Sequence, residues 1–170
     1  MLQSAANDLL KLPKLVKKGG RLKKEVFFNQ QVPFKETFIL ASPENTRYVF
    51  FYEVDQSAKN VFKFSLHLMD NETKIGLLRV DFNGGHQNPS DITYNLPEEL
   101  HQFAGKHFSH NESHMHHFVE GYKSLAWAIP IEGNFPVQSI ASSDDVLQAF
   151  HAFNAMITLG THFTIGASLI

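Results

Sequence analysis

The residues best suited to chemistry lie in one short run, His114-Met-His-His-Phe-Val-Glu120. Side chains alternate between the two faces of a β-strand, so a strand here would place His114, His116 and Glu120 on one face, together with Phe118. Two imidazoles and a carboxylate on one face can bind a metal ion or exchange a proton. This run is therefore the candidate functional site.

A second polar run follows the strand predicted over residues 75–82. Arg79 and Asp81 share one face of that strand, and Asn83-Gly-Gly ends it just before His86. If the two strands are neighbours, six side chains could converge into a catalytic or binding site. These candidates are His114, His116, Glu120, Arg79, Asp81 and His86.

Two chemical interpretations of this set are open. In the first, His114 or His116 acts as general base and another histidine as general acid in metal-independent phosphodiester cleavage, while Arg79 stabilises phosphate charge. In the second, His114, His116 and Glu120 bind zinc or iron and leave coordination positions open. That spacing resembles the first motif of cupin barrels, although Trp127 stands where the motif has a glycine.

A third interpretation assigns these residues no chemistry. His114 and His116 would form structural hydrogen bonds with Asp81, Glu120 or the backbone inside a half-buried strand. The other histidines are expected to be core or interface residues (His67, His151, His162) or to face solvent (His101, His107, His110). Ten histidines in one chain also predict a stability or assembly that changes between about pH 5 and 7.

Periodicity and turn residues predict a single domain over residues 1–170. A helix over 4–15 and a basic connector fill residues 1–25, and an antiparallel β core spans 26–131 with a long connection at 86–112. A C-terminal helix over 144–157 and a tail complete the segment 142–170. The predicted strands are 34–41, 47–54, 61–69, 75–82, 113–122 and 124–131. The expected fold class is α+β, with an antiparallel sheet of about five to seven strands, strongly curved or barrel-like, flanked by the two helices.

Several short motifs together resemble one family. They are Asp8-Leu-Leu-x-Leu-x-Lys14, Arg79-x-Asp81-x-Asn83, His86-x-Asn88-Pro89, His114-x-His116-x-Phe118-x-Glu120-Gly121 and Trp127-Ala-Ile-Pro130. This pattern is similar to a family of small bacterial, phage and prophage proteins known only as a domain of unknown function. The resemblance covers most of the chain and departs from it in the connection over 87–111 and in the tail over 158–170. It implies a mobile-element or host-interaction setting and brings no reaction with it.

Composition excludes several classes of protein. The chain of 170 residues has no Cys, so disulfides, thiolate metal sites and Cys nucleophiles are absent, and its net charge of −2 gives no overall field that would recruit nucleic acid. The phosphate loop of nucleotide-binding proteins, the nucleophile elbow of hydrolases and the zincin helix motif are absent as well. No apolar stretch is long enough to span a membrane. We expect a soluble, cytoplasmic protein.

One local basic patch stands out against this charge balance. Its members are Lys14, Lys17, Lys18, Arg21, Lys23 and Lys24. The patch is either a solvated, mobile connector or a phosphate-binding arm through which the protein could contact nucleic acid.

The sequence leaves three functions open. The first is a phage- or prophage-related binding or host-interaction module with a protein partner, which could also form a homo-oligomer. The second is a small His-based hydrolase or ribonuclease-like enzyme, and the third is a cupin-like metal-binding site. The only cofactor that the residues suggest is a divalent metal, zinc or iron.

Overall fold

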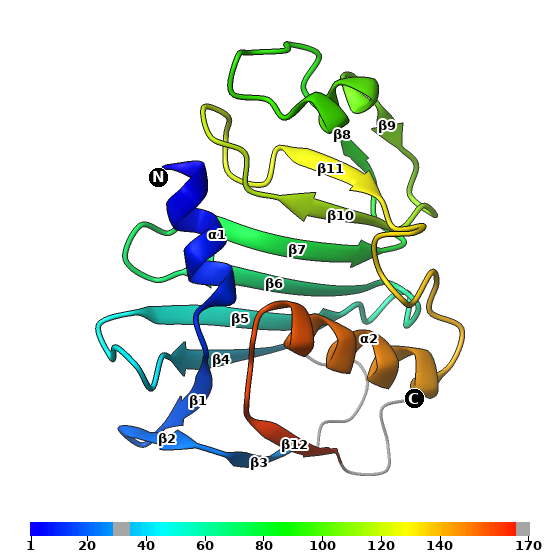
Figure 1. The fold of residues 1–170 in the computed structure, drawn as a ribbon. Coiled ribbons are helices and arrows are strands. Elements are labelled where there is room, and N and C mark those ends of the chain that lie inside the picture. Colours follow the sequence, from blue (N-terminus) through cyan, green and yellow to red (C-terminus); the bar gives the residue numbers. More distant parts are fainter. Residues whose placement is uncertain (29–34, 166–170) are drawn as a thin grey trace.

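The computed structural model describes residues 1–28 and 35–165, and its largest element is one antiparallel sheet. The strands of this sheet are β1 (Leu15–Lys18), β2 (Arg21–Lys23), β4 (Lys35–Ala41), β5 (Val49–Gln56), β6 (Phe64–Asp70), β7 (Gly76–Phe82), β10 (His114–His117) and β11 (Trp127–Pro130). They lie in the order β11-β10-β7-β6-β5-β4-β1-β2 (Figure 1). Most neighbours in the sheet are also neighbours in the chain, which is typical of strands joined by short turns.

Two short strand pairs and three helices complete the described part of the fold. Strand β12 (His162–Ile165) pairs in parallel with β3 (Glu25–Phe28), and β8 (His86–Gln87) pairs with β9 (His107–Phe108). The helices are α1 (Gln3–Lys11), the 3-10 helix η1 (Glu98–Phe103) and α2 (Ser143–Met156). Within residues 1–28 and 35–165, no helix has the length and apolar character needed to cross a lipid bilayer.

The predicted α+β class, the antiparallel sheet and the two flanking helices are confirmed. The expectation of five to seven strands in a strongly curved or barrel-like sheet is wrong, because the sheet has eight strands and stays open between β11 and β2. A barrel forms only when the first and last strands pair with each other. The additional strands come from the basic connector, which forms the hairpin β1–β2.

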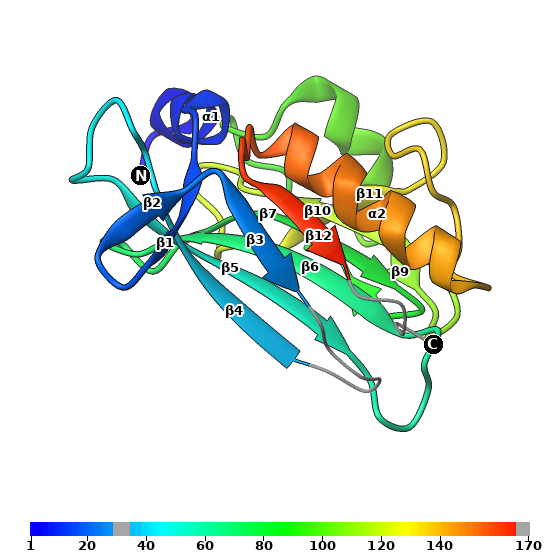
Figure 2. The ribbon, with the colours of Figure 1, turned by 90° about the horizontal axis from the view of Figure 1, so that it is seen from below.

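The burial of side chains alternates strictly along the central strands, which gives the sheet two different faces. Strands β5 and β6 alternate between buried and half-buried positions along their whole length. The buried side chains pack under α2, where the ring of Tyr52 stacks at 6.0 Å on Phe150 and at 5.5 Å on Phe153 (centroid distances). Figure 2 shows α2, β3 and β12 together on this side of the sheet. Aromatic packing on one face therefore determines which side chains of each strand lie on the other.

Helix α2 begins where the sequence predicts, because its first turn carries a capping box. The Ser142 hydroxyl accepts a hydrogen bond from the backbone N–H of Asp145, and the Asp145 carboxylate accepts one from the backbone N–H of Ser142. The predicted connection at 86–112 contains β8, η1 and β9. The tail contributes β12; its residues 166–170, and the predicted strand start at Phe34, lie outside the described residues.

Lys14 departs most from the solvated connector that the sequence suggests. It is fully buried, and its Nζ donates to the backbone carbonyls of Leu10 (3.0 Å), Leu12 (2.7 Å) and Ile157 (2.8 Å). The ammonium also lies 4.8 Å from the ring centroid of Phe50. Burial lowers the pKa of Lys14 to about 7, while the three carbonyls oppose that shift because they accept all three N–H groups of the charged form. Lys14 thus joins the C-terminal ends of α1 and α2.

Replacing Lys14 with Met should therefore destabilise the fold. The variant leaves the carbonyl oxygens of Leu12 and Ile157 without this donor, and that of Leu10 with only the Thr158 hydroxyl (3.1 Å), so we expect the free energy of unfolding to fall by roughly 3 kcal/mol. Chemical denaturation would measure it, with Lys18→Met, an exposed position at the end of the following strand β1, as the control that should change stability by less than about 0.5 kcal/mol. Equal effects of the two variants would contradict this role of Lys14.

Candidate functional site

The candidate site forms where β7 pairs with β10, on the face of the sheet opposite α2. The register sets Asp81 opposite His114 and Arg79 opposite His116. The two predicted strands are thus neighbours, and directly paired residues of an antiparallel sheet point to the same face. Figure 1 shows β7, β10 and β11 side by side, with β8 and β9 next to them.

Asp81 lies at the centre of this group. Its Oδ2 is 3.2 Å from Nε2 of His116 and 3.8 Å from Nε2 of His114. The guanidinium of Arg79 binds the same carboxylate in a bidentate manner, since Nε lies 2.8 Å from Oδ2 and Nη2 lies 2.9 Å from Oδ1. Burial acts to raise the pKa of Asp81, but the hydrogen bonds from His116 and Arg79 outweigh burial and hold this pKa well below its usual range. Asp81 is therefore a buried carboxylate that stays ionised.

Backbone carbonyls orient both imidazoles. Nδ1 of His116 lies 2.9 Å from the carbonyl oxygen of Leu125, and Nδ1 of His114 lies 3.4 Å from that of Glu112. A carbonyl can only accept, so in each neutral ring the proton is on Nδ1 and the lone pair is on Nε2. Burial, followed by the nearby His116, lowers the pKa of His114 to about 4, so this imidazole is neutral at pH 7. Nε2 of His114 then directs a lone pair towards Asp81, whereas Nε2 of His116 either donates a proton to Asp81 or, in the neutral ring, directs a lone pair to the same place.

Rings from the β8–β9 pair cover the two histidines. The ring centroid of His86 is 4.5 Å from His116 and 5.7 Å from His114, and that of Phe108 is 4.8 Å from His114. Gly84 lies beneath them, where an added Cβ would be only 3.2 Å from Cβ of Asp81. The site is consequently enclosed, with His114 only 1% exposed, and it opens mainly at Arg79, whose side chain is 41% exposed.

His86 and Asn88 complete the outer edge of β11. Nε2 of His86 donates to the carbonyl of Ala126 (3.0 Å), and the buried amide of Asn88 both accepts from the N–H of Ala128 (2.9 Å) and donates to its carbonyl (2.8 Å). Two side chains thus replace the strand that this edge lacks. His86 thus contacts His114 and His116 and also stabilises the edge of β11. Asn88 was not among the predicted site residues, although the spacing His-x-Asn-Pro carries the signal for its role.

Glu120 lies away from the group that the sequence predicted it to join. Its carboxylate accepts from the backbone N–H of Gln3 (2.8 Å) in α1, and its own N–H donates to the Gln3 side chain (3.1 Å). The expected alternation fails because β10 ends at His117, and Phe118 then packs into the main core. Asp81 takes the place beside the histidines that was expected for Glu120.

The polar face continues from the site across the sheet. Arg79 is opposite His67 on β6, and His67 is opposite Glu53 on β5. Nδ1 of His67 lies 3.2 Å from a carboxylate oxygen of Glu53. His67, expected to be a core or interface residue, thus forms part of this polar row, whereas His101, His107 and His110 are exposed as expected. His151 and His162 are exposed as well, so their expected place in the core is wrong.

Asp81, His114 and His116 form a set that could hold a metal ion. One ligand atom from each residue lies within 4.8 Å of the others, and all three residues are buried. Their donor atoms, two imidazole nitrogens and one carboxylate oxygen, suit transition metals such as zinc. The carbonyls on both Nδ1 atoms and Arg79 on Asp81 are the outer contacts that commonly orient metal ligands.

The Asn88 amide should contribute strongly to stability. Asn88→Ala removes the partners of both backbone groups of Ala128 and of the carbonyl of Phe103 (3.0 Å), so we expect the free energy of unfolding to fall by about 2–4 kcal/mol. Asn134→Ala, which removes two hydrogen bonds at an exposed position, is the control in urea denaturation. If both variants lower the free energy of unfolding by the same amount, Asn88 does not stabilise the edge of β11 in this way.

The buried histidines predict a loss of stability in acid. Burial lowers the pKa values of His67 and His86, and it lowers those of His114 and His117 to about 4. The unfolded chain, with histidine pKa values near 6.5, then binds more protons than the folded chain, so stability is present at pH 7 and is lost as the pH falls towards 4.

We expect His117 alone to account for roughly 2 kcal/mol of this loss between pH 7 and pH 5. Urea denaturation in EDTA at both pH values would measure the fall, and His117→Gln should reduce it by that amount. His151→Gln, at an exposed position on α2, should leave the fall unchanged. An undiminished fall in His117→Gln would show that His117 does not contribute.

Comparison with known proteins identifies the family but no activity. The model of a family of unknown function, DUF6978, matches residues 1–159. No curated protein and no solved structure matches the chain. The description of the family names no reaction, partner or mobile-element origin, so these expectations gain nothing from the match. Because the matched region covers nearly the whole sequence, the chain belongs to the family of unknown function DUF6978.

Proposed function

We propose that this protein binds one divalent transition-metal ion through Asp81, His114 and His116. The observation that carries the proposal is the convergence of three lone-pair donors in one buried place. The carboxylate of Asp81 is ionised, and both Nε2 atoms face it because both Nδ1 atoms are turned to carbonyls. When both imidazoles are neutral, three electron-rich atoms this close together repel one another unless a cation lies between them.

A metal ion satisfies this arrangement better than a proton. A second proton on His116 would pair its Nε2 with Asp81 at 3.2 Å, but it would leave Nε2 of His114 at 3.8 Å without a close partner. An ion can accept lone pairs from all three ligands at once. This is the arrangement in which metal-binding histidines typically occur, with the second ring nitrogen donating to a carbonyl.

The donor set favours zinc or ferrous iron over magnesium or calcium. Magnesium and calcium prefer oxygen ligands, whereas imidazole nitrogens favour the transition metals. Three protein ligands leave at least one coordination position for a water molecule. A bound zinc ion would lower the pKa of that water. Arg79 would hold Asp81 in place and line the exposed side of the centre.

Metal-independent phosphodiester cleavage has less support from the geometry. His114 and His116 are 1% and 6% exposed, and rings of the β8–β9 pair cover them, so a bulky substrate has little direct access to either imidazole. The expectation of a partner-binding module is supported by a different part of the molecule, the outer edge of β4.

Elemental analysis after equilibration with zinc and removal of the excess tests the proposal. We expect about one zinc per chain, lost in Asp81→Asn and in His116→Ala because each removes a ligand. Glu120→Gln, which alters the carboxylate predicted from the sequence but bonded to α1, should retain the ion. Zinc at a hundredfold excess over its Kd should add about 2.7 kcal/mol to the free energy of unfolding.

The variants also separate metal loss from unfolding. Each should keep the far-ultraviolet circular dichroism of the parent protein in EDTA. Folded parent protein that binds no zinc, or equal zinc retention by Asp81→Asn and Glu120→Gln, would refute the proposed centre.

A further inference from the structure

We propose that the outer edge of β4, with the groove beside it, binds an extended acidic polypeptide segment as an added strand. This inference concerns a part of the molecule remote from the metal ligands and does not depend on them. It rests on three observations: a strand edge that, among the described residues, is paired along most of its length on one side only, an apolar groove next to it, and a basic hairpin beside that groove.

The first observation is the pairing of β4. Strand β5 pairs with β4 along its whole length, from Lys35 to Ala41. On the other side, β1 pairs only with Leu40 and Ala41. Among the described residues, the stretch 35–39 therefore has a strand neighbour on one side only. Such an edge presents backbone N–H and C=O groups in the spacing that another extended chain needs.

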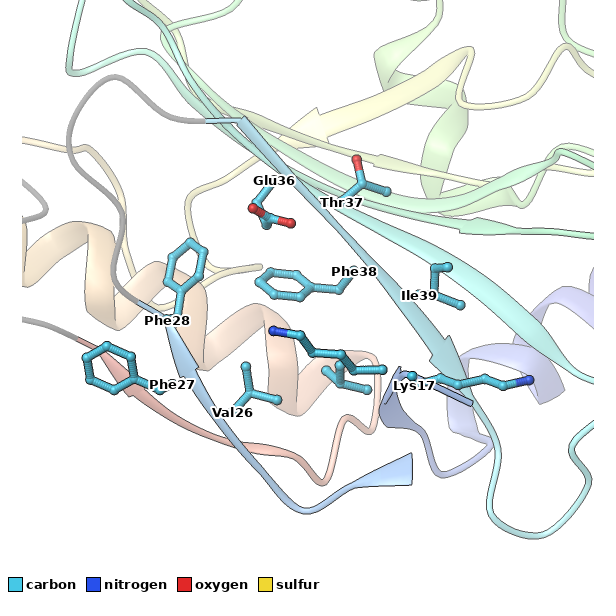
Figure 3. Close-up of a pocket in the computed structure, with 11 residues that line it drawn as sticks. Lys17, Val26, Phe27, Phe28, Glu36, Thr37, Phe38 and Ile39 are labelled. Atoms are coloured by element: carbon cyan, nitrogen blue, oxygen red, sulfur yellow. The ribbon is translucent and has the colours of Figure 1, made fainter. Parts of the chain in front are cut away.

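The second observation is the groove that separates this edge from β3. It has a volume of about 480 Å³, and Val26, Phe28 and Phe38 contribute to its apolar lining. Figure 3 shows Phe28 and Phe38 across the gap between the two strands, where their ring centroids are 5.5 Å apart. Phe27 and Ile39, which also line the groove, are 66% and 44% exposed. Large apolar side chains gathered at a hollow are typical of a surface that a partner covers.

The third observation is the charge along the rim. Lys17 and Lys18 line the groove, and Arg21 and Lys23 belong to the same β1–β2 hairpin, which Lys24 follows. No salt bridge within residues 1–28 and 35–165 involves any of these five cations. The lining also includes the carboxylate residue Glu36, which has an interaction of its own. Five cations without an ionic partner among the described residues, on a chain of net charge −2, favour a negatively charged ligand.

The edge and the apolar lining favour a polypeptide over a nucleic acid. Extended backbone can pair with backbone groups of β4 while alternate side chains enter the groove, as in other cases of strand addition. A nucleic acid would use the cations for its phosphates and could stack a base on Phe27, but it would leave the strand edge unpaired. Five of the six cations predicted to form a phosphate-binding arm are thus assigned to acidic side chains of a peptide; the sixth, Lys14, is buried.

Fluorescence anisotropy with defined probes tests this inference. The probes are a labelled decapeptide of alternating valine and glutamate, its valine-lysine counterpart and single-stranded dT10. The test variant is Lys17→Glu/Lys18→Glu, and the matched control is Lys59→Glu/Lys123→Glu, which makes the same change of charge at two exposed positions outside the hairpin. We expect the acidic peptide to bind the parent protein and the control, and to bind the test variant at least tenfold more weakly.

Hydrogen exchange distinguishes strand addition from a purely electrostatic contact. The bound acidic peptide should slow amide exchange within residues 35–39 and leave that of β10 unchanged. Absence of binding up to millimolar acidic peptide overturns the inference, as does binding that leaves residues 35–39 unprotected. Binding of dT10 that is tighter than that of the peptide, and lost in the test variant, would also overturn it by assigning the hairpin to nucleic acid.

Discussion

The antiparallel register between β7 and β10 is the constraint on which the site depends. It sets Asp81 opposite His114 and Arg79 opposite His116. Because side chains alternate with a period of two, a slip of one residue would move His114 and His116 into the core and bring Met115 onto the polar face. Met115 is only 2% exposed and belongs to the main core, so core packing opposes such a slip. The apolar residues of these strands thus place the polar ones.

Burial of this polar group costs free energy, and its surroundings offset that cost. Desolvation disfavours the ionised Asp81, and hydrogen bonds from His116 and Arg79 outweigh it. The edge next to the site has a comparable problem, because β10 is the one strand neighbour of β11 among the described residues. The side chains of His86 and Asn88 solve it by bonding the backbone of Ala126 and Ala128. The short segment of β8 and the following Asn88 that completes the sheet edge also carries His86 over the histidines, so the edge and the site are built together.

Local signals explain which features of the fold could be predicted from the sequence. The capping residue Ser142 and the alternation in β5 and β6 depend on residues close together in the chain, and the observed elements lie within a few residues of those predicted. The positions of Lys14 and Glu120 depend on distant parts of the chain. Nζ of Lys14 bonds a carbonyl 143 residues away, and Glu120 bonds Gln3 across 117 residues. Asp81 was among the candidates, but a single sequence does not show strand pairing and could not distinguish it from Glu120 as the carboxylate beside the histidines.

The two proposed sites use different parts of one sheet, a face and an edge. The metal ligands lie on a sheet face, where register aligns side chains, whereas peptide binding uses a strand edge, where backbone groups are available. Strands β6 and β5 lie between β7 and β4, which separates the sites by roughly 14 Å at the usual strand spacing. Substitutions that far apart, with no shared partner, generally have additive effects. The polar row of Arg79, His67 and Glu53 crosses this interval on one face, and the shared core crosses it on the other, so any departure from additivity would have to pass through these side chains or through the hydrogen-bonded ladder that carries them.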